Sequence, residues 1–193
     1  MTHMHVAGSV HADVAAAGPQ WLTLPDDVNA LDPALWSASA DRGDDGIVEV
    51  AGAAVTELAS QYGSPLYVLD ESDFRQRART FRDAFSGWDV YYAGKAFLTR
   101  TIASWIDEEG LFLDTCTGGE LMTALQGGMD PTRIGLHGNN KSVDELKLAL
   151  SAGVGRIIVD SLDEITRIEQ LCRENGWHAR VTVSYTHLRA HET

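Results

Sequence analysis

The chain has 193 residues, of which 44% are hydrophobic, and its formal net charge is −13. This length and composition are those of a globular domain with a buried core. The acidic charge argues against nucleic acid as a partner, since phosphate binding needs clustered Lys and Arg. Two cysteines exclude a disulfide framework and a zinc spacing. No apolar run has the length of a membrane span and no secretory signal begins the chain, so we expect a cytoplasmic protein.

Residues 1–45 are rich in Ala, Asp, Gly and Pro and show little periodicity, which predicts an irregular segment. Three histidines occur there without carboxylate or cysteine partners, a pattern that gives little support to a metal site: His3, His5 and His11. A turn cluster at 41–46 precedes a predicted short strand at 47–50. A predicted short helix then ends at Gly63.

The pattern becomes regular after Pro65. Residues 66–69 form a short apolar run that predicts a strand, and Asp70 can cap the helix that follows. Gly87 is expected to end this helix, in which apolar residues recur at helical spacing: Phe74, Ala78, Phe81 and Phe85.

A buried strand is predicted over 88–92, and it is followed by Ala93, Gly94 and Lys95. Aromatic and β-branched residues favour the strand, while the two small residues let another group approach the backbone closely. A lysine at this point lies at the mouth of a sheet, where its amine can react with a carbonyl compound to form a Schiff base. The alternative is that Lys95 merely extends from a strand end into solvent.

Three similar units follow a predicted helix at 99–109. Each unit has a short apolar strand, then Ser or Thr with Glu three residues later, and a glycine after the helix: 111–114 with Thr117, Glu120 and Gly127; 134–137 with Ser142, Glu145 and Gly153; 157–160 with Ser161, Glu164 and Gly176. The Ser/Thr-x-x-Glu spacing is that of a capping box, and glycine commonly ends helices. Repeated strands and capped helices predict a parallel sheet.

Polar residues recur where these strands end: Lys95, Asp114, His137 and Asp160. In a βα barrel this is the face on which active sites are built, and a doubly wound sheet places its crevice at the same strand ends. The repeat alone leaves both folds open. A sixth strand is predicted at 179–183, after which the pattern stops, whereas a complete barrel needs about 250 residues.

Four stretches of the sequence resemble a known family: Tyr92–Phe97, Leu113–Leu121, His137–Ser142 and Val159–Ser161. In order and spacing they resemble the N-terminal part of the diaminopimelate decarboxylases of the actinobacterial kind, over about residues 40–183. The resemblance implies pyridoxal 5'-phosphate as the cofactor. It also implies an α/β fold, namely a partial (β/α)8 TIM-type barrel of the alanine-racemase-like group, truncated after about the sixth strand.

Three parts of the chain follow from this resemblance. Residues 1–45 would be a partly irregular N-terminal extension, residues 46–183 the N-terminal part of the pyridoxal-phosphate-binding barrel domain, and residues 184–193 a tail unlike the family. In the family, the histidine that stacks on the cofactor, the glycine-rich phosphate site and the glutamate facing the pyridine nitrogen come from later strands. None of these can be matched here.

The resemblance also implies roles for four residues. Lys95 matches the lysine that binds the cofactor covalently and is the expected catalytic residue. Asp114 matches an acidic residue close to the cofactor and the lysine, and His137 and Asn139 match the lining of the cofactor pocket. Two alternatives stay open, because Asp114 can cap the next loop and His137 can simply hydrogen-bond at a strand end.

The neighbouring residues have simpler expected roles. Cys116 is expected to be a small buried residue, and Lys141 is expected to be solvated. Gly118 and Gly119, at the start of a predicted helix, could bind an anion or could allow close packing.

The implied reaction is decarboxylation of meso-2,6-diaminopimelate to L-lysine. The expected partners are a small amino-acid substrate and a second copy in a homodimer, with no nucleic acid and no membrane. A decarboxylase of ornithine or arginine, or an alanine racemase, is an alternative. A hypothesis of another class is an inactive chain with weak or no cofactor binding, because its sheet has open edges and its site is incomplete.

Overall fold

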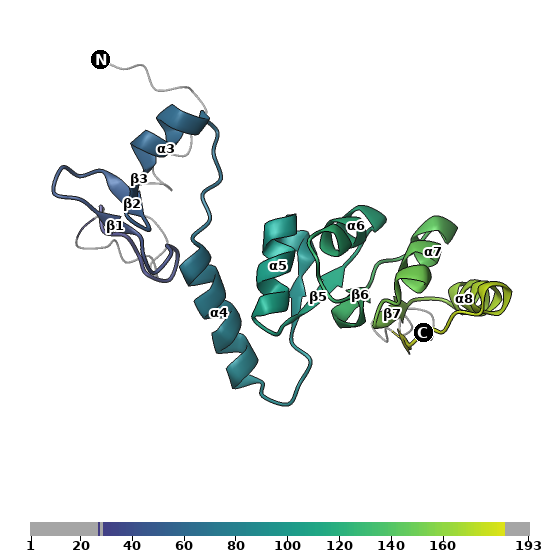
Figure 1. The fold of residues 1–193 in the computed structure, drawn as a ribbon. Helices are drawn as coiled ribbons and strands as arrows, with labels where there is room; N and C mark the ends of the chain where they lie inside the picture. Colours follow the sequence, from purple (N-terminus) through teal and green to yellow (C-terminus); the bar gives the residue numbers. More distant parts are fainter. Residues whose placement is uncertain (1–26, 28, 184–193) are drawn as a thin grey trace, which may run out of the picture. The chain divides into compact units, whose positions relative to one another are not determined.

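The computed structural model describes residue 27 and residues 29–183, which divide between two compact units, Met1–Asp70 and Glu71–Thr193 (Figure 1). The first unit contains β1 (Asp41–Arg42), β2 (Val48–Val50), β3 (Ala53–Ala54) and α3 (Val55–Tyr62). The second contains α4 (Glu71–Ala84), β4 (Tyr91–Ala93), η1 (Gly94–Ala96), α5 (Arg100–Glu108), β5 (Phe112–Thr115), α6 (Gly118–Gln126), η2 (Pro131–Arg133), β6 (Ile134–Leu136), α7 (Val143–Ala152), β7 (Arg156–Val159), α8 (Leu162–Asn175) and β8 (Val181–Val183).

The first unit is a small antiparallel sheet followed by one helix. Its strand order is β1-β2-β3, and Val50 pairs with Ala53 across the tight connection between β2 and β3. The predicted strand at 47–50 is confirmed as β2, and α3 ends at Gly63 as predicted. The predicted turn at 41–46 is only partly right, because β1 begins inside it.

The predicted strand at 66–69 is wrong. These residues form no strand, and their apolar side chains are exposed, that of Tyr67 to 88%. Strand propensity in a four-residue run is realised only when a neighbouring strand pairs with its backbone. Among the described residues β4 pairs with β5 alone, so the parallel sheet has five strands and β4 is its edge.

The second unit is a sheet whose strands follow the order of the sequence. The order is β4-β5-β6-β7-β8, and every neighbouring pair is parallel. One row of paired residues crosses four strands, from the last residue of β4 to the first residue of β7: Ala93, Asp114, Gly135 and Arg156. The predicted succession of βα units from 88 to 183 is therefore confirmed.

Helices cover one face of this sheet. Leu113, Leu136 and Ile157 are buried and belong to the same hydrophobic core as the buried side chains of α5, α6, α7 and α8. The alternate residues Phe112 and Ile158 are only half-buried. A doubly wound sheet buries both faces under helices, whereas a barrel packs helices on its outer face alone. The one-sided core agrees with a partial barrel.

The helices of the three repeats begin and end where the sequence predicts. The hydroxyl groups of Thr117, Ser142 and Ser161 accept the N–H groups of the glutamates three residues later, at 3.1, 3.2 and 3.2 Å. The C-caps are Gly127, Gly153 and Gly176. Side-chain caps satisfy backbone donors that a helix leaves unpaired at its start.

The three glutamates bind loop amides, but in two different ways. A reciprocal capping box, predicted for all three helices, exists only in α7. The carboxylates accept the following N–H groups: Glu120 that of Cys116 at 2.6 Å, Glu145 those of Ser142 at 2.9 Å and Gly118 at 2.8 Å, and Glu164 that of Asp160 at 3.2 Å. Each strand-to-helix loop is thus held by a carboxylate of the helix that follows or of the next helix.

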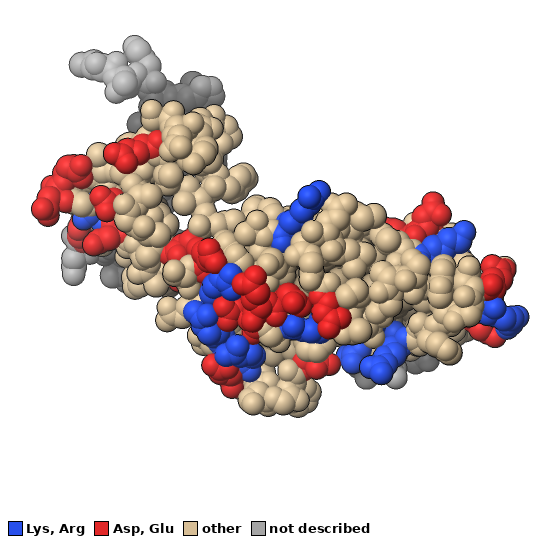
Figure 2. Space-filling model, in the orientation of Figure 1, with Lys and Arg blue, Asp and Glu red and all other residues tan. Residues whose placement is uncertain are grey.

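Ion pairs hold α4 to the end of α5, where basic and acidic side chains intermingle (Figure 2). The Arg75 guanidinium contacts the carboxylates of Glu108 at 2.7 Å and Glu109 at 3.1 Å, and it lies over the ring of Trp105. Arg79 contacts Glu109 at 2.8 Å.

None of the helices in the described part of the chain has the length and apolar composition needed to cross a lipid bilayer.

We expect Gly155→Ala to destabilise the protein. A Cβ at this position would lie 1.8 Å from the carbonyl oxygen of Thr132, so the backbone must move. Overpacking of this kind costs about 1–3 kcal/mol. Gly119→Ala is the control, since its Cβ would meet nothing nearer than 3.8 Å, and alanine in a helix gains up to about 1 kcal/mol over glycine. Urea denaturation measures both variants, and equal stabilities would contradict the packing at Gly155.

We expect Glu145→Gln to remove a pH-dependent part of the stability. Hydrogen bonds from the backbone of Ser142 and Gly118 lower the pKa of the Glu145 carboxyl. A lowered pKa in the folded state stabilises the protein above the pKa of the unfolded chain, and the contribution is lost as the pH falls through the folded value. The variant should therefore lose about 1 kcal/mol at pH 7 and progressively less below about pH 4.5. A pH-independent difference in urea denaturation, or an equal loss in the exposed control Glu174→Gln, would contradict this.

Candidate active site

Lys95 lies in η1, the short turn that follows β4, and its side chain is exposed. The hydroxyl of Tyr92 donates a hydrogen bond to the carbonyl of Phe97 at 2.8 Å and so closes this turn. Burial raises the pKa of Tyr92, which keeps the phenol protonated as the donor. The turn therefore presents the lysine amine from a fixed backbone at the carboxyl end of the strand.

Gly94 brings this turn against the next strand. A Cβ on Gly94 would lie 2.9 Å from the carbonyl oxygen of Asp114, closer than real Cβ contacts occur. The preceding residue, Ala93, is the register partner of Asp114. Lys95 therefore follows a residue that is packed directly on the backbone of Asp114, and only glycine permits this approach.

Asp114 and His137 meet at the ends of neighbouring strands. The Oδ2 atom of Asp114 lies 3.4 Å from Nδ1 of His137, and the backbone N–H of His137 donates to the carbonyl of Thr115 at 2.7 Å. The loop after β5 is capped by Thr117 and Glu120. Capping of that loop, the alternative role of Asp114, is thus performed by other residues.

Asn139 lies two residues beyond His137 in an exposed loop. Gly138 has φ of +101°, and a Cβ there would lie 2.9 Å from the carbonyl oxygen of Cys116. The loop after β6 is therefore packed closely on the loop after β5. The structure thus brings Lys95, Asp114, His137 and the loop of Asn139 to the same end of the sheet, where the strands end.

Lys141 is buried, so its prediction as a solvated residue is wrong. Its side chain is 2% exposed, and its ammonium group lies 3.0 Å from the carboxylate of Glu164, whose side chain is also 2% exposed. The partner lies 23 residues away in the sequence, and no local pattern indicates it. The sequence contains three lysines, and Lys147 is exposed on α7. Among the three, Lys95 is the accessible amine that follows the carboxyl end of a strand.

The smaller residues of the loop after β5 have structural environments. Gly118 donates its N–H to Glu145, and a Cβ there would lie 3.0 Å from the Glu145 side chain, which supports close packing over anion binding. Cys116 is half-buried rather than buried. Burial, followed by the charges of Asp114 and Glu120, raises the pKa of its thiol. The thiol is therefore protonated at neutral pH.

The described residues suit the carbonyl group and the ring of pyridoxal phosphate better than its phosphate group. An amine, a carboxylate and an imidazole lie at an edge lined by the small residues Ala93 and Gly94, which suits a carbonyl group and a ring. The amides of Cys116, Gly118 and Asp160 already donate to glutamates. The loops after β5 and β7 therefore do not offer these amides to a phosphate.

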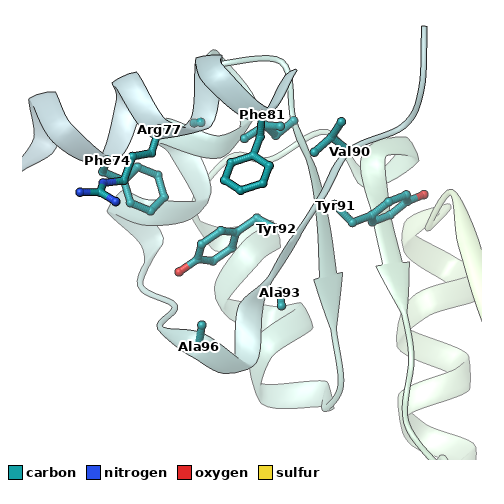
Figure 3. A pocket seen from close by; sticks show the side chains of 10 residues that line it. Phe74, Arg77, Phe81, Val90, Tyr91, Tyr92, Ala93 and Ala96 are labelled. Carbon is teal, nitrogen blue, oxygen red and sulfur yellow. The ribbon is translucent and has the colours of Figure 1, made fainter. Parts of the chain in front are cut away.

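A cavity of about 480 Å³ lies between α4 and β4 and extends to Ala93 and Ala96, the residues that flank Gly94 and Lys95. Figure 3 shows the rings of Phe74, Phe81 and Tyr92 around it. Its charged lining residue, Arg77, pairs with Asp73 at 2.7 Å. A cavity with this aromatic and aliphatic lining does not suit an anionic cofactor.

No metal site is present in the described part of the chain, where no group of three or more His, Cys, Asp or Glu side chains could hold an ion. The three N-terminal histidines and the predicted tail at 184–193 lie outside the described residues.

Residues 71–192 match the sequence model of the family described as "Pyridoxal-dependent decarboxylase, pyridoxal binding domain". The chain is 48% identical to the diaminopimelate decarboxylase of Mycobacterium leprae over 187 residues, which cover 95% of this chain and 40% of that protein. It is 52% identical to that of Mycobacterium tuberculosis over 157 residues, covering 81% and 35%. The chain thus spans about 35–40% of these relatives. They confirm the resemblance seen in the sequence.

A solved structure shares the fold. The crystal structure of the diaminopimelate decarboxylase of M. jannaschii in complex with L-lysine matches with a TM-score of 0.68 and 27% identity, over 76% of this chain and 36% of that one. The predicted partial α/β barrel is confirmed, and pyridoxal phosphate is confirmed as the cofactor of the family. The chain belongs to the pyridoxal-dependent decarboxylases and contains residues of their pyridoxal-binding domain.

Proposed function

We propose that this chain supplies the lysine-bearing part of a diaminopimelate decarboxylase, which converts meso-2,6-diaminopimelate to L-lysine and carbon dioxide. The observation that supports this best is the accessible Lys95 beside Asp114 at the strand ends of a partial barrel. The identities of 48% and 52% to diaminopimelate decarboxylases support the choice of substrate.

Lys95 is the proposed catalytic residue, because its amine can bind the carbonyl carbon of pyridoxal phosphate covalently. The cofactor, when bound, supplies an electron sink for the bond that breaks as carbon dioxide leaves. The chain's own contribution is orientation. The Tyr92–Phe97 hydrogen bond and the close approach of Gly94 to Asp114 fix the backbone from which the amine extends.

Asp114, His137 and Asn139 are the proposed cofactor-binding residues beside Lys95. The carboxylate of Asp114 can accept a hydrogen bond from Nδ1 of His137 when that nitrogen carries the proton, which fixes the plane of the imidazole. Asn139 can both donate and accept hydrogen bonds from its side-chain amide. A ring bound at Lys95 would then meet polar groups from two neighbouring strand ends.

The proposal extends to the substrate and to assembly. The complex of the M. jannaschii enzyme with L-lysine supports a small amino acid as the substrate class. A homodimer of the full-length enzyme remains a prediction that rests on the resemblance, and a cytoplasmic location remains a prediction from the sequence. Because the stacking histidine, the glycine-rich phosphate site and the glutamate of the family are not matched in this chain, we expect these 193 residues alone to bind the cofactor weakly and to be inactive.

A chimera tests the proposed function. Residues 71–183 replace the matching segment of the Mycobacterium tuberculosis enzyme, and release of carbon dioxide is measured with meso-diaminopimelate, ornithine and arginine. We expect decarboxylation of meso-diaminopimelate, and a loss of at least about 1,000-fold in the Lys95→Ala chimera, because covalent attachment of the cofactor is removed.

The control for this loss is Lys147→Ala, which removes an exposed lysine of α7 and should retain the rate. A chimera that folds and decarboxylates ornithine or arginine faster would favour the alternative substrate. Full activity without the Lys95 amine would contradict its proposed role.

A further inference from the structure

The ammonium group of Lys141 is enclosed by acceptors from three segments of the chain. It donates to the carbonyl of Gly138 at 2.8 Å and to that of Ile158 at 2.6 Å. It also contacts both carboxylate oxygens of Glu164, at 3.0 and 3.1 Å. An ammonium group has three N–H donors, and here two carbonyls and one carboxylate accept them. The group is therefore satisfied within the protein, away from solvent.

These contacts join a loop, a strand and a helix. Gly138 lies in the loop after β6, Ile158 lies in β7, and Glu164 lies in the first turn of α8. The carboxylate of Glu164 also accepts the N–H of Asp160, so it holds the loop after β7 as well. The ion pair thus fixes the loop after β6 to the next unit of the sheet.

The loop held in this way contains two of the proposed cofactor-binding residues. His137 is fixed on one side by its N–H bond to the carbonyl of Thr115 at 2.7 Å. On the other side, the carbonyl of the next residue, Gly138, is bound by Lys141. Asn139 and Asn140, both exposed, lie between Gly138 and Lys141. Removing the ammonium group would free the carbonyl on one side of His137 and leave Asn139 unrestrained.

We propose that Lys141 is a positioning residue, which with Glu164 holds the loop 137–140 in the conformation that places His137 and Asn139 beside the cofactor. This inference rests on the proposed function for what the loop binds. Lys141 does not touch the cofactor itself, because its ammonium group is enclosed by Gly138, Ile158 and Glu164. The two lysines of the site have separate roles: Lys95 reacts, and Lys141 fixes the loop.

The test uses the whole chain and three variants. Lys141→Met removes the ammonium group but leaves the carboxylate of Glu164 buried without its partner. The double variant Lys141→Met/Glu164→Gln removes both charges, and glutamine can still accept the N–H of Asp160, so this variant avoids an unpaired buried charge. Lys147→Met is the matched control, since it removes an exposed lysine from α7, the helix that follows Lys141.

The first readout is amide hydrogen exchange, followed by mass spectrometry without cofactor. In both Lys141 variants we expect exchange in 137–140 to accelerate by about tenfold or more relative to α5, because the loop loses hydrogen bonds to a charged group. Lys147→Met should leave the loop at the wild-type rate. Loop exchange that stays at the wild-type rate in the double variant, or that rises only in parallel with α5, would overturn the proposal.

The second readout is the affinity for pyridoxal phosphate, measured by absorbance titration. A positioning role predicts about tenfold weaker binding in the double variant, with no change in Lys147→Met. Unchanged affinity with a loosened loop would overturn the positioning of the cofactor. If borohydride reduction finds the bound pyridoxal phosphate on a residue other than Lys95 while the loop still loosens in the double variant, the proposed function fails and the hold of Lys141 on the loop is upheld.

Discussion

The candidate site lies at the carboxyl ends of the strands, and the conformation of the loops there depends on three buried or half-buried carboxylates. Glu120, Glu145 and Glu164 each occupy the third position of a helix, and each accepts a backbone N–H from a strand-to-helix loop. These bonds hold the loop backbone without a ligand. A site built on loops fixed in this way loses little entropy when a ligand binds, which is the physical meaning of preorganisation.

The second constraint is that the sheet is covered on one face only. Its core lies between the strands and α5–α8, whereas Phe112, Asp114 and Ile158 are half-buried on the other face. At the far edge, Val181 and Val183 of β8 are exposed. Among the described residues β4 and β8 are the edge strands, and the half-covered face agrees with a partial barrel. The chain spans about 35–40% of the relatives that it matches.

Local sequence signals predicted most of the fold, since they report local interactions. The caps Thr117, Ser142 and Ser161 were predicted from spacing alone, because the cap and the amide that it binds are three residues apart. The strand at 66–69 was predicted from propensity and is absent, because a strand also needs a partner that no local pattern supplies. The reciprocal capping box is absent from two helices. There the glutamate carboxylate accepts the N–H of the residue before the N-cap, and not that of the N-cap itself.

The candidate site was predicted in part. Polar residues that follow parallel strands are expected at one end of the sheet. This expectation placed Lys95, Asp114 and His137 together, and the structure agrees. Lys141 was missed because its partner, Glu164, is distant in the sequence and becomes its neighbour only when β7 lies beside β6. A polar loop sequence gives no sign of that burial.

Lys95 is the amine proposed to bind pyridoxal phosphate, and the small number of lysines makes this attachment directly measurable. The chain is incubated with pyridoxal phosphate and reduced with borohydride, and the modified residues are mapped by mass spectrometry. We expect modification at Lys95, with Lys141 protected by burial and Lys147 labelled only at the slow rate of an exposed amine. Modification of Lys147 to the same extent as Lys95, or undiminished labelling of the chain in Lys95→Ala, would contradict it.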